Sequence, residues 1–441
     1  MPAICVFVRN QFHHDARVTR ICSSLQEQGF ETTVFAVAAV GAPASDSWED
    51  GHLVARVNVE TPIHRSARFV TRSLATLVRR PKPARAGTDV SAPRERSQTQ
   101  TSLQPVGTGR KSARALLLPL NRTWQNVAYA REAGRRAGRL HPVAYHCNDL
   151  NTVLAGWVAR RIHPAPLIYD SHELWPHRKR ADAGPIKTFV GELADRYWAR
   201  RADAVVTVND SIAQHMQRRY RVRQVHVVRN LPATTSRVEP AAAYAIGHVP
   251  RPRLMYVGGV QTHRGLEELI DAMPLIKHGT LVVVGPGNDA YRGELEERAR
   301  SRRVADRVVF HGLVPHAQLV GVLATGDIGF ALIKNFCLSY YLSLPNKLTE
   351  YIHAGLPVVA SDFPEMRSVV EGNQVGIVCD PSDPAAIARS VNELLADTEG
   401  LERMKANARA AARELNWELE SKRLLAIYRE LIPADRWPVK S

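Results

Sequence analysis

The chain has 441 residues, too many for one hydrophobic core, so its length predicts two domains. Hydrophobic residues make up 45% and charged residues 23%, as in ordinary globular proteins, and no apolar run approaches the ~20 residues of a transmembrane helix. Lysine and arginine number 59 against 43 aspartates and glutamates, and the net charge of +16 predicts an anionic partner. Phosphorylated small molecules, nucleic acid and an acidic membrane face all fit that charge.

The first half of the chain alternates short apolar strands with amphipathic helices. We expect strands at residues 3–9, 32–37, 143–147, 166–170, 204–208 and 224–228. We expect helices at residues 15–28 and 150–161. This alternation is typical of a parallel α/β sheet, so a first Rossmann-like domain is predicted over residues 1–235.

One segment of the first half lacks this periodicity. Residues 79–111 hold eight basic and two acidic residues with almost no large apolar side chain, which predicts a disordered insertion. The preceding residues 63–80 can form a helix with one basic and one apolar side. Residues 63–111 therefore suit an anionic membrane surface, where each Lys or Arg contributes ~1 kcal/mol. The alternative is a solvated surface helix followed by a tolerated insertion.

The second half repeats the strand–helix rhythm. We expect strands at residues 253–259, 280–285, 307–312, 327–333 and 356–361. A proline-containing stretch without periodicity predicts a linker at 236–250 before a second domain at 251–415. An amphipathic helix at 417–431 closes the chain within a tail spanning 416–441. The expected architecture is α/β, with two doubly wound domains facing each other across a cleft.

The cysteines and the first residues indicate a compartment. The five cysteines are scattered without a CxxC pair, which argues against a disulfide framework or a zinc site and favours a reducing environment. The chain opens on the strand-like AICVFV without a basic region before it, unlike a secretory signal. We expect a cytoplasmic protein, peripheral on the inner membrane face if residues 63–111 bind lipid.

Two motifs follow predicted strands of the second half and suit phosphate. Gly258 and Gly259 end one strand, and Arg264 stands at the start of the next helix, where amides and a guanidinium can grip a diphosphate. The stretch SLPNKLTEYIHAG begins a second helix, with Lys347 and Glu350 on one face. Lys347 suits phosphate oxygens, and Glu350 can accept hydrogen bonds from a ribose diol. The alternatives are a tight turn with a surface arginine and a simple surface ion pair.

The order of the motifs resembles a known family. YVGGVQTHRG, VVVGPGND, RVVFHGLVPHAQL, PNKLTEYIHAGLPVVASDFPE and VGIVCDPSDPAAIARSV together look like the donor half of a family 4 glycosyltransferase of the GT-B fold. DARVTRICSSLQEQGFETTVFA, YHCNDLNTVLAGWVARR, LIYDSHELWP and RRADAVVTVNDSIAQHM are similar to that family's acceptor domain. The resemblance spans nearly the whole chain except residues 79–111.

The resemblance implies a reaction and its partners. A sugar would pass from a nucleotide-diphosphate sugar, with retention at the anomeric carbon, to a saccharide, lipid-linked or small-molecule acceptor. Such transfer serves glycan, glycolipid or secondary-metabolite synthesis and needs neither metal nor cofactor. The C-terminal helix would cross back to brace the first domain, so that domain closure assembles the site.

The resemblance also implies site residues. Arg264 and Lys347 would stabilise the departing diphosphate, while His146 and Asp149, beyond a strand end, would face the acceptor or the sugar. Asp170, His172 and Glu173 end another strand in the same way. The nucleotide site would comprise Gly258, Gly259, Gly285, Gly312, Leu313, Asn346 and Glu350. For His146 the alternative is a hydrogen-bonded core histidine.

The chain departs from the family pattern at three places. Leu342 stands where the family often has a sugar-binding Glu, and Gly259 where it often has an Arg. The first strand lacks a glycine-rich loop, and His13, His14 and Arg17 offer positive charge there instead. These departures leave open how the sugar is held.

Two other functions stay open. A nucleotide-sugar 2-epimerase of the same fold would need acid and base groups in the cleft. A non-catalytic relative would bind anionic surfaces only. Nucleic acid is not an expected partner, because aromatic residues are only 7% and no basic–aromatic module is present.

Overall fold

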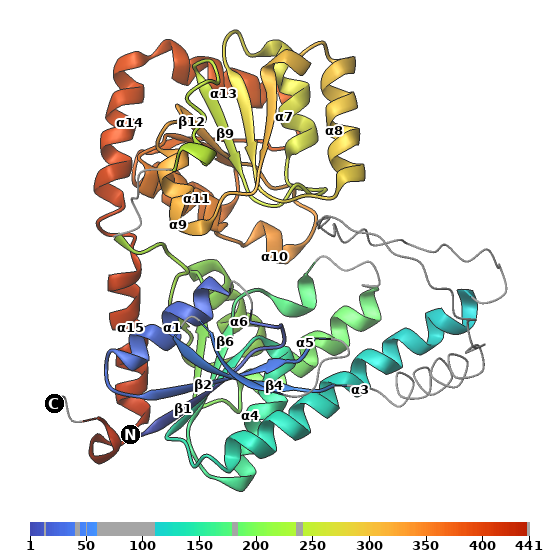
Figure 1. Cartoon of the computed structure of the whole chain (residues 1–441), viewed down its shortest axis with the longest axis vertical. Coiled ribbons are helices and arrows are strands. Elements are labelled where there is room, and N and C mark those ends of the chain that lie inside the picture. The colour runs from blue at the N-terminus through green and yellow to red at the C-terminus, as the bar shows by residue number, and fades with distance from the viewer. Residues whose placement is uncertain are drawn as a thin grey trace, which may run out of the picture.

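The computed structural model contains two β-sheets, each covered by helices and stacked along the long axis of the molecule (Figure 1). It describes residues 1–12, 15–39, 45–49, 51–59, 111–178, 184–234 and 241–438, with the backbone alone for 111–122 and 243. The predicted α/β class with two doubly wound sheets is confirmed.

The first domain contains an eight-stranded sheet in the order β3-β4-β2-β1-β5-β6-β7-β8, parallel except for the β3–β4 pair. The strands are β1 (Ala3–Phe7), β2 (Glu31–Val37), β3 (Asp46–Glu49), β4 (His52–Val57), β5 (Ala144–Asn148), β6 (Leu167–Ser171), β7 (Ala204–Thr207) and β8 (His226–Val227). The helices are α1 (Ala16–Gln26), α3 (Lys111–Gly138), α4 (Leu150–Ile162), α5 (Pro185–Ala199) and α6 (Asp210–Tyr220). The order reverses between β1 and β5, the point where doubly wound sheets bind ligands.

The second domain contains a six-stranded parallel sheet in the order β11-β10-β9-β12-β13-β14. The strands are β9 (Arg253–Val257), β10 (Thr280–Val284), β11 (Val308–Gly312), β12 (Ile328–Ala331), β13 (Val358–Ser361) and β14 (Gly376–Cys379). The helices are α7 (Leu266–Ala272), α8 (Asp289–Ser301), α9 (His316–Leu323), α10 (Leu338–Tyr341), α11 (Asn346–Ala354), α12 (Pro364–Gly372), α13 (Pro384–Ala396), α14 (Thr398–Ala411) and α15 (Trp417–Leu431). This sheet reverses its order between β9 and β12.

Most of the central strands are buried on both faces, which explains their largely apolar sequences. In β1, Ile4 and Val6 belong to one core cluster, while Cys5 and Phe7 belong to the cluster on the opposite face. The same alternation divides β10 between the two core clusters of the second domain.

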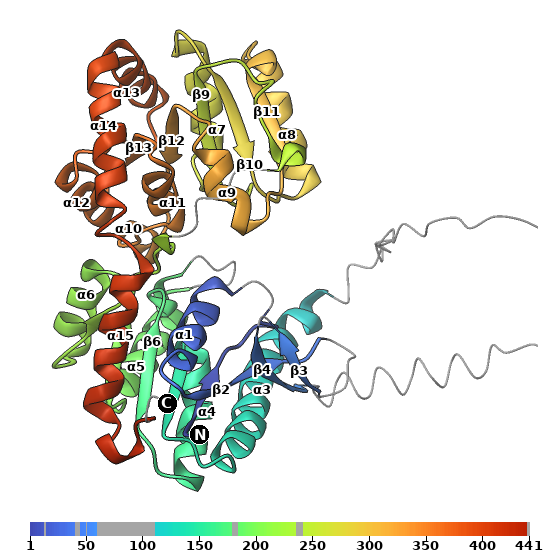
Figure 2. The ribbon, with the colours of Figure 1, turned by 60° about the vertical axis from the view of Figure 1, so that its left-hand side comes forward.

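The predicted crossover helix is confirmed as α15, which leaves the second domain and packs along α1 of the first (Figure 2). Asn416 caps it by accepting a hydrogen bond from the Leu419 amide. Trp417 donates from Nε1 to Ser24 Oγ in α1 at 3.0 Å. Leu424 and Tyr428 are buried in the same core cluster as β1.

Some elements differ from the sequence-based expectations. The β3–β4 pair and α3 were not predicted, and the strand expected at 224–228 is reduced to the two residues of β8. The predicted helix and insertion lie outside the described residues, except that Lys111 begins α3 and is not disordered. Within the described ranges, no helix has the length and apolar character needed to cross a membrane.

Candidate active site

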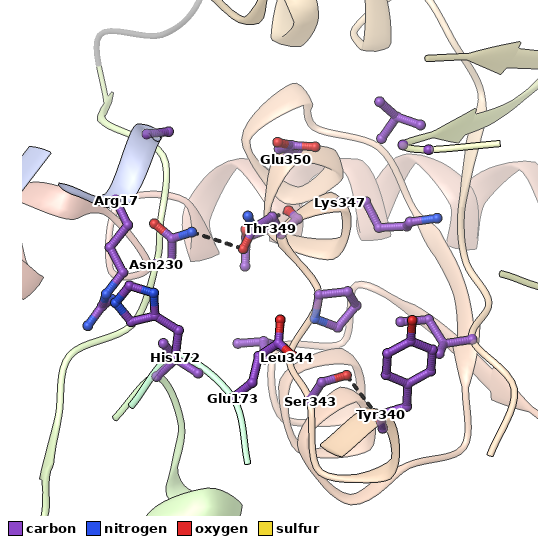
Figure 3. Close-up of a pocket in the computed structure, with 18 of the residues that line it drawn as sticks. Arg17, His172, Glu173, Asn230, Tyr340, Ser343, Leu344, Lys347, Thr349 and Glu350 are labelled. Atoms are coloured by element: carbon purple, nitrogen blue, oxygen red, sulfur yellow. Dashed lines mark hydrogen bonds between the residues drawn. The ribbon is translucent and has the colours of Figure 1, made fainter. Parts of the chain in front are cut away.

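A cavity of about 640 Å³ lies between the carboxyl ends of the two sheets (Figure 3). From the first domain it is lined by residues that follow β1, β6, β7 and β8, including Arg17, His172, Glu173 and Asn230. From the second domain it is lined by the turn after β9, by Tyr340 and by the start of α11. Among the predicted site residues, the cavity brings together Gly258, Gly259, Arg264, Asn346, Lys347 and Glu350.

The turn after β9 holds the backbone close to the cavity. Gly258 has φ 126°, a conformation that favours glycine. The Tyr256 hydroxyl donates to Gly259 O at 3.0 Å and closes this turn. Gly285, after β10, packs so closely that a side chain on it would collide with the carbonyl oxygen of Gly258. The Gly285 amide in turn donates to Gly312 O at 2.8 Å.

Gly285, Gly312 and Leu313 are not among the cavity-lining residues. Gly285 supports the Gly258 turn from behind. Leu313 is 67% exposed at the end of β11. A base-binding role for Gly312 and Leu313 stays a prediction.

Lys347 is a buried cation beside the cavity. Only 7% of its surface is exposed to solvent, and its Nζ has no hydrogen-bond partner within the described ranges. The Nζ lies 3.7 Å from the ring centroid of Tyr256. Burial, with a further contribution from Arg264, holds the pKa of Lys347 well below its ordinary value, although Glu350 opposes the shift. An anion placed beside Nζ would relieve this destabilisation of the charged form.

Arg264 adds a second positive group. It precedes α7 and places its guanidinium 5.1 Å from the ring centroid of Tyr340. Within the described residues its side chain forms no ion pair or hydrogen bond, although it attracts the carboxylate of Glu173 across the cavity. No side chain caps α11, so the amides of its first turn also stay available for an anion. The second domain therefore presents two cations and a helix start to one cavity.

Glu350 lies one helical turn after Lys347 and also lines the cavity. Burial raises the pKa of its carboxyl, while His316, Lys347 and Arg20 oppose the shift. Asn346 accepts from Asn230 Nδ2 at 3.2 Å and thereby joins α11 to the first domain.

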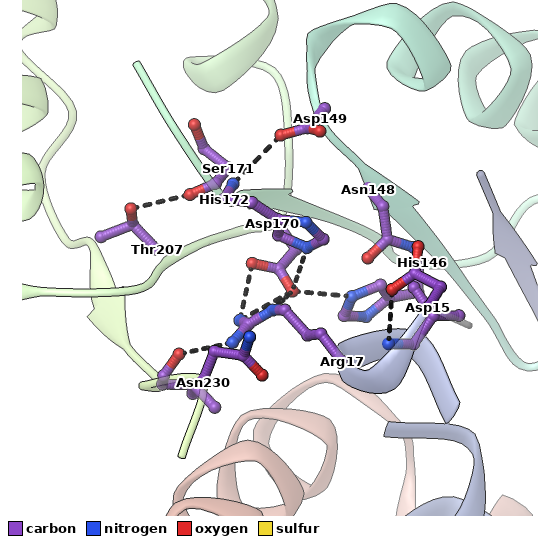
Figure 4. Close-up of polar contacts among 12 residues, drawn as sticks. Asp15, Arg17, His146, Asn148, Asp149, Asp170, Ser171, His172, Thr207 and Asn230 are labelled. Atoms are coloured by element: carbon purple, nitrogen blue, oxygen red, sulfur yellow. Dashed lines mark hydrogen bonds and ion pairs between the residues drawn. The ribbon is translucent and has the colours of Figure 1, made fainter. Parts of the chain in front are cut away.

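The first domain contributes a buried ion cluster centred on Asp170 (Figure 4). Arg17 donates from Nε and Nη2 to the two oxygens of Asp170 at 3.0 and 2.9 Å. His146 and His172 each place Nε2 at 3.3 Å from Asp170 Oδ2. Burial alone would raise the pKa of Asp170, but Arg17, followed by the two histidines, outweighs it and holds that pKa well below its ordinary value. The cluster fixes Arg17 and His172 at the cavity.

The prediction that His146 faces the sugar or the acceptor is wrong in the structure. His146 is fully buried, and its Nδ1 lies 2.8 Å from the Tyr428 hydroxyl of α15. Burial lowers its pKa. The cause is strand alternation, which turns His146 toward α15 and makes it the hydrogen-bonded core histidine of the alternative interpretation.

Asp149 is not a cavity residue either. It precedes α4 with φ 63°, and its Oδ1 accepts a hydrogen bond from the backbone amide of His172 at 3.1 Å. Asp149 thus supports the loop that carries His172 and Glu173, and its contact with substrate stays a prediction.

Several cavity residues were not assigned to the site from the sequence. Glu173 forms an ion pair with Arg178 at 2.7 Å, and burial raises the pKa of its carboxyl. Asn230 had no recognisable motif around it. Arg17 and Glu173 did follow predicted strands, and this position was the only feature of the sequence that pointed to a role in the site. His13 and His14 lie outside the described residues.

The two family departures have structural consequences. Leu342 packs against a core cluster of the first domain, and its carbonyl oxygen accepts from Asn209 Nδ2 at 2.8 Å. An apolar contact between the domains thus stands where the family often has a carboxylate. Gly259 lines the cavity without adding a charge.

Two family models match the chain. Residues 84–231 match the model described as Glycosyltransferase Family 4, and residues 251–397 match the one described as Glycosyl transferases group 1. One relative is the D-inositol 3-phosphate glycosyltransferase of Xylanimonas cellulosilytica, 28% identical over 62% of this chain and 68% of the relative. Another is the alpha-D-kanosaminyltransferase of Streptomyces kanamyceticus, 27% identical over 55% of this chain and 64% of the relative.

Solved structures agree on the fold. Sucrose-phosphate synthase from Thermosynechococcus elongatus superposes with a TM-score of 0.72 at 17% identity, covering 98% of this chain and 99% of the other. Anabaena HepE in complex with UDP-glucose superposes with a TM-score of 0.67 at 14% identity, covering 98% and 100%. With both halves matched in order, the chain belongs to the family 4 glycosyltransferases of the GT-B fold.

Proposed function

We propose that this glycosyltransferase takes its sugar from a nucleotide-diphosphate donor bound in the cavity between the domains. The observation that carries the proposal is the convergence of Arg264 and Lys347, two cations whose side chains form no ion pair or hydrogen bond among the described residues. A diphosphate is the donor group that would neutralise both. Glu350, one turn further along α11, is suited to the hydroxyls of the ribose.

Charge stabilisation would drive the chemical step. As the glycosidic bond to the diphosphate breaks, negative charge develops on the leaving group and the sugar becomes oxocarbenium-like. Arg264, Lys347 and the first amides of α11 are preorganised for that charge. Glu173 and His172 lie on the opposite wall, where the acceptor would enter.

Retention of configuration and metal independence are proposed on the family resemblance. The acceptor is proposed to be a saccharide, a lipid-linked sugar or a small molecule, in glycan, glycolipid or secondary-metabolite synthesis. Comparing the anomeric configuration of donor and product by NMR tests retention, and activity in the presence of EDTA tests metal independence. An inverted product would overturn retention, and activity that EDTA abolishes and Mg²⁺ or Mn²⁺ restores would overturn metal independence of the transfer step.

The matched relatives are transferases, which favours transfer over the 2-epimerase and over a non-catalytic relative. A thermal-shift screen against UDP-, GDP- and dTDP-sugars tests donor binding, because a ligand that binds only the folded state raises its apparent stability. We expect one nucleotide series to raise the Tm. No shift with any series would contradict the proposal, and an epimer formed from UDP-GlcNAc without acceptor would favour the epimerase.

We also propose that the enzyme works at an anionic membrane surface. Residues 63–111 stay the predicted contact, and α5 supports the idea from within the described chain. Its outer face exposes apolar side chains at helical spacing, each between 46% and 78% exposed: Ile186, Phe189, Val190, Leu193 and Tyr197. Lys187, Arg200 and Arg201 are exposed on or beside the same helix, which fits an interfacial helix.

Liposome flotation tests the membrane proposal. The protein is expected to float with vesicles containing an anionic lipid, and the Phe189→Ser/Leu193→Ser variant is expected to bind less. Leu275→Ser, at an exposed apolar residue of the second domain, is the matched control. Equal binding to neutral vesicles would remove the electrostatic component, and unchanged binding of the double variant would remove α5 from the surface.

A further inference from the structure

Three potential metal ligands meet outside the cavity. His177 ends a 3-10 turn, Trp175–His177, that follows β6, while Glu192 lies on α5 and His215 on α6. One ligand atom from each of the three lies within 4.8 Å of the others. None of the three lines the cavity described above.

The two imidazoles have unsatisfied nitrogens. His177 Nε2 and His215 Nε2 are both buried, and neither has a hydrogen-bond partner among the residues that the structure describes. Their rings meet edge to face with centroids 5.8 Å apart. Burial lowers the pKa of each histidine, which favours the neutral form that a metal ion binds. Buried polar atoms are normally paired, so two unpaired nitrogens beside a carboxylate are available to a ligand.

The carboxylate of Glu192 has one competing partner. Arg219 donates from Nε to Glu192 Oε1 at 2.8 Å, and His177 Nε2 lies 3.9 Å from the same oxygen. The Arg219 side chain is 64% exposed, so it can turn into water when a cation approaches. Exposed ion pairs of this kind contribute little to stability.

We propose that His177, Glu192 and His215 bind one zinc-like divalent metal ion. Two imidazole nitrogens and one carboxylate oxygen are a recurrent zinc ligand set, and they leave a fourth position for water. The ligand atoms, now within 4.8 Å of one another, would close to the ~3.4 Å separation that bonds of ~2.0–2.2 Å impose at a tetrahedral ion. Side-chain rotation on three half-buried residues can supply that movement.

The ion would fasten three elements together. It would tie the turn at Trp175–His177 to α5 and α6. That turn directly follows the segment that carries the cavity residues His172 and Glu173. Helix α6 follows Asn209, whose side chain donates a hydrogen bond to the carbonyl oxygen of Leu342 in the second domain. The site would therefore stiffen one wall of the cavity. The site could not be predicted from the sequence, because its ligands come from three elements without motif spacing and none of them is a cysteine.

Calorimetric titration with ZnCl₂ tests the proposal on tag-free, chelator-treated protein. We expect one ion per chain, with affinity at least tenfold weaker in His177→Gln and in His215→Gln. Arg219→Gln removes the competing cation and is expected to raise the affinity severalfold. The control is the double variant His141→Gln/His163→Gln, which removes an exposed pair of imidazoles with Nδ1 atoms 3.2 Å apart and is expected to leave the affinity unchanged.

The outcomes separate a built site from surface histidines. Binding that survives in both single histidine variants, or that is lost in the control, would overturn the proposal. Circular dichroism checks that each variant is folded. If a variant fails to fold, CoCl₂ spectroscopy of the unmodified protein decides: we expect a four-coordinate cobalt spectrum that one equivalent of zinc abolishes, and a spectrum that zinc leaves unchanged contradicts the site.

Discussion

At the scale of single residues, the second-domain side of the cavity holds charged side chains that form no ion pair or side-chain hydrogen bond within the described residues. Lys347 is buried without a hydrogen-bonding partner in the described chain, and Glu350 one turn away has a carboxyl pKa raised by burial. Burying a charged group is unfavourable unless a ligand or another side chain pairs with it or forms hydrogen bonds to it. Their arrangement on one helical face is therefore explained by a ligand with both phosphate and hydroxyl groups.

Replacing either residue should weaken donor binding. Lys347→Ala and Glu350→Ala are each expected to lower the affinity for the nucleotide sugar by about ten- to a hundredfold, the ~1.5–3 kcal/mol of hydrogen bonds to charged groups. Calorimetry with the nucleotide sugar that raises the Tm is the measurement. Lys422→Ala and Glu430→Ala, exposed on α15, are the controls. Unchanged affinity in both cavity variants would refute the site.

The pH dependence of donor binding follows from the lowered pKa of Lys347. Only the protonated amine attracts the diphosphate, so affinity should fall as pH rises through a pKa lying below the ordinary lysine value. Lys347→Arg keeps the positive charge at high pH and should shift this fall upward. Calorimetry across a pH series measures it. A fall at the same pH in both proteins would show that another group titrates.

The sequence predicted the charged residues of the second domain better than those of the first. Arg264, Lys347 and Glu350 stand inside recognisable motifs, and all three line the cavity. His146 also stood at a predicted strand end, yet it is buried in the core and does not reach the cavity. Which way a residue near a strand end points depends on strand alternation and on α15, a helix far away in the sequence.

At the scale of elements, one buried carboxyl joins three of them. Asp195 of α5 accepts hydrogen bonds from Tyr169 of β6 at 2.5 Å and from Tyr220 of α6 at 3.1 Å. Burial raises the pKa of Asp195 to about 7, although both tyrosines oppose the shift. The folded protein therefore holds this proton more tightly than the unfolded chain does.

The raised pKa of Asp195 predicts a stability change with pH. Below about pH 4 the group is protonated in both states, and between about pH 4 and 7 the unfolded chain ionises first, so the free energy of unfolding falls as pH rises. Asp195→Asn cannot ionise and should lose less stability over that range, by a few kcal/mol. Urea unfolding at pH 5 and pH 7.5 measures the difference. Parallel pH profiles for the two proteins would contradict the assignment.

Elements with large apolar side chains were predictable, and those without them were not. Strand β10, for example, is an apolar run of Leu and Val that needed no tertiary information. Helix α3 packs on α4 at Gly134 and Gly138, and its buried residues include Ala130, Ala133 and Ala137, so its buried face carries little hydrophobic signal. Strand β3 is mostly polar and pairs only with β4 at the sheet edge.

At the scale of the whole molecule, α15 and a few polar contacts connect the domains. Besides the Asn209–Leu342 contact, the backbone amide of Ser211 donates to Glu365 Oε1 at 2.5 Å. The order of the motifs allowed the two-domain architecture and the crossover helix to be predicted. The contacts between the domains were not predictable, because each joins residues far apart in sequence that share no motif.

Loss of packing under α15 should destabilise the first domain. Leu424 is fully buried in the core cluster that contains β1, so Leu424→Ala should lower the free energy of unfolding by about 2–5 kcal/mol. The measurement is the urea midpoint, with the exposed neighbour Lys422→Ala as the control. A loss below about 1 kcal/mol would mean that α15 contributes little to the fold.

The central claim is that the two domains enclose a nucleotide diphosphate held by Arg264 and Lys347. A crystal structure with UDP or GDP, chosen by the thermal-shift screen, tests it most directly. The account predicts the diphosphate within hydrogen-bonding distance of both side chains and the ribose hydroxyls on Glu350. A nucleotide bound elsewhere, or Arg264 and Lys347 turned away from the diphosphate, would contradict it.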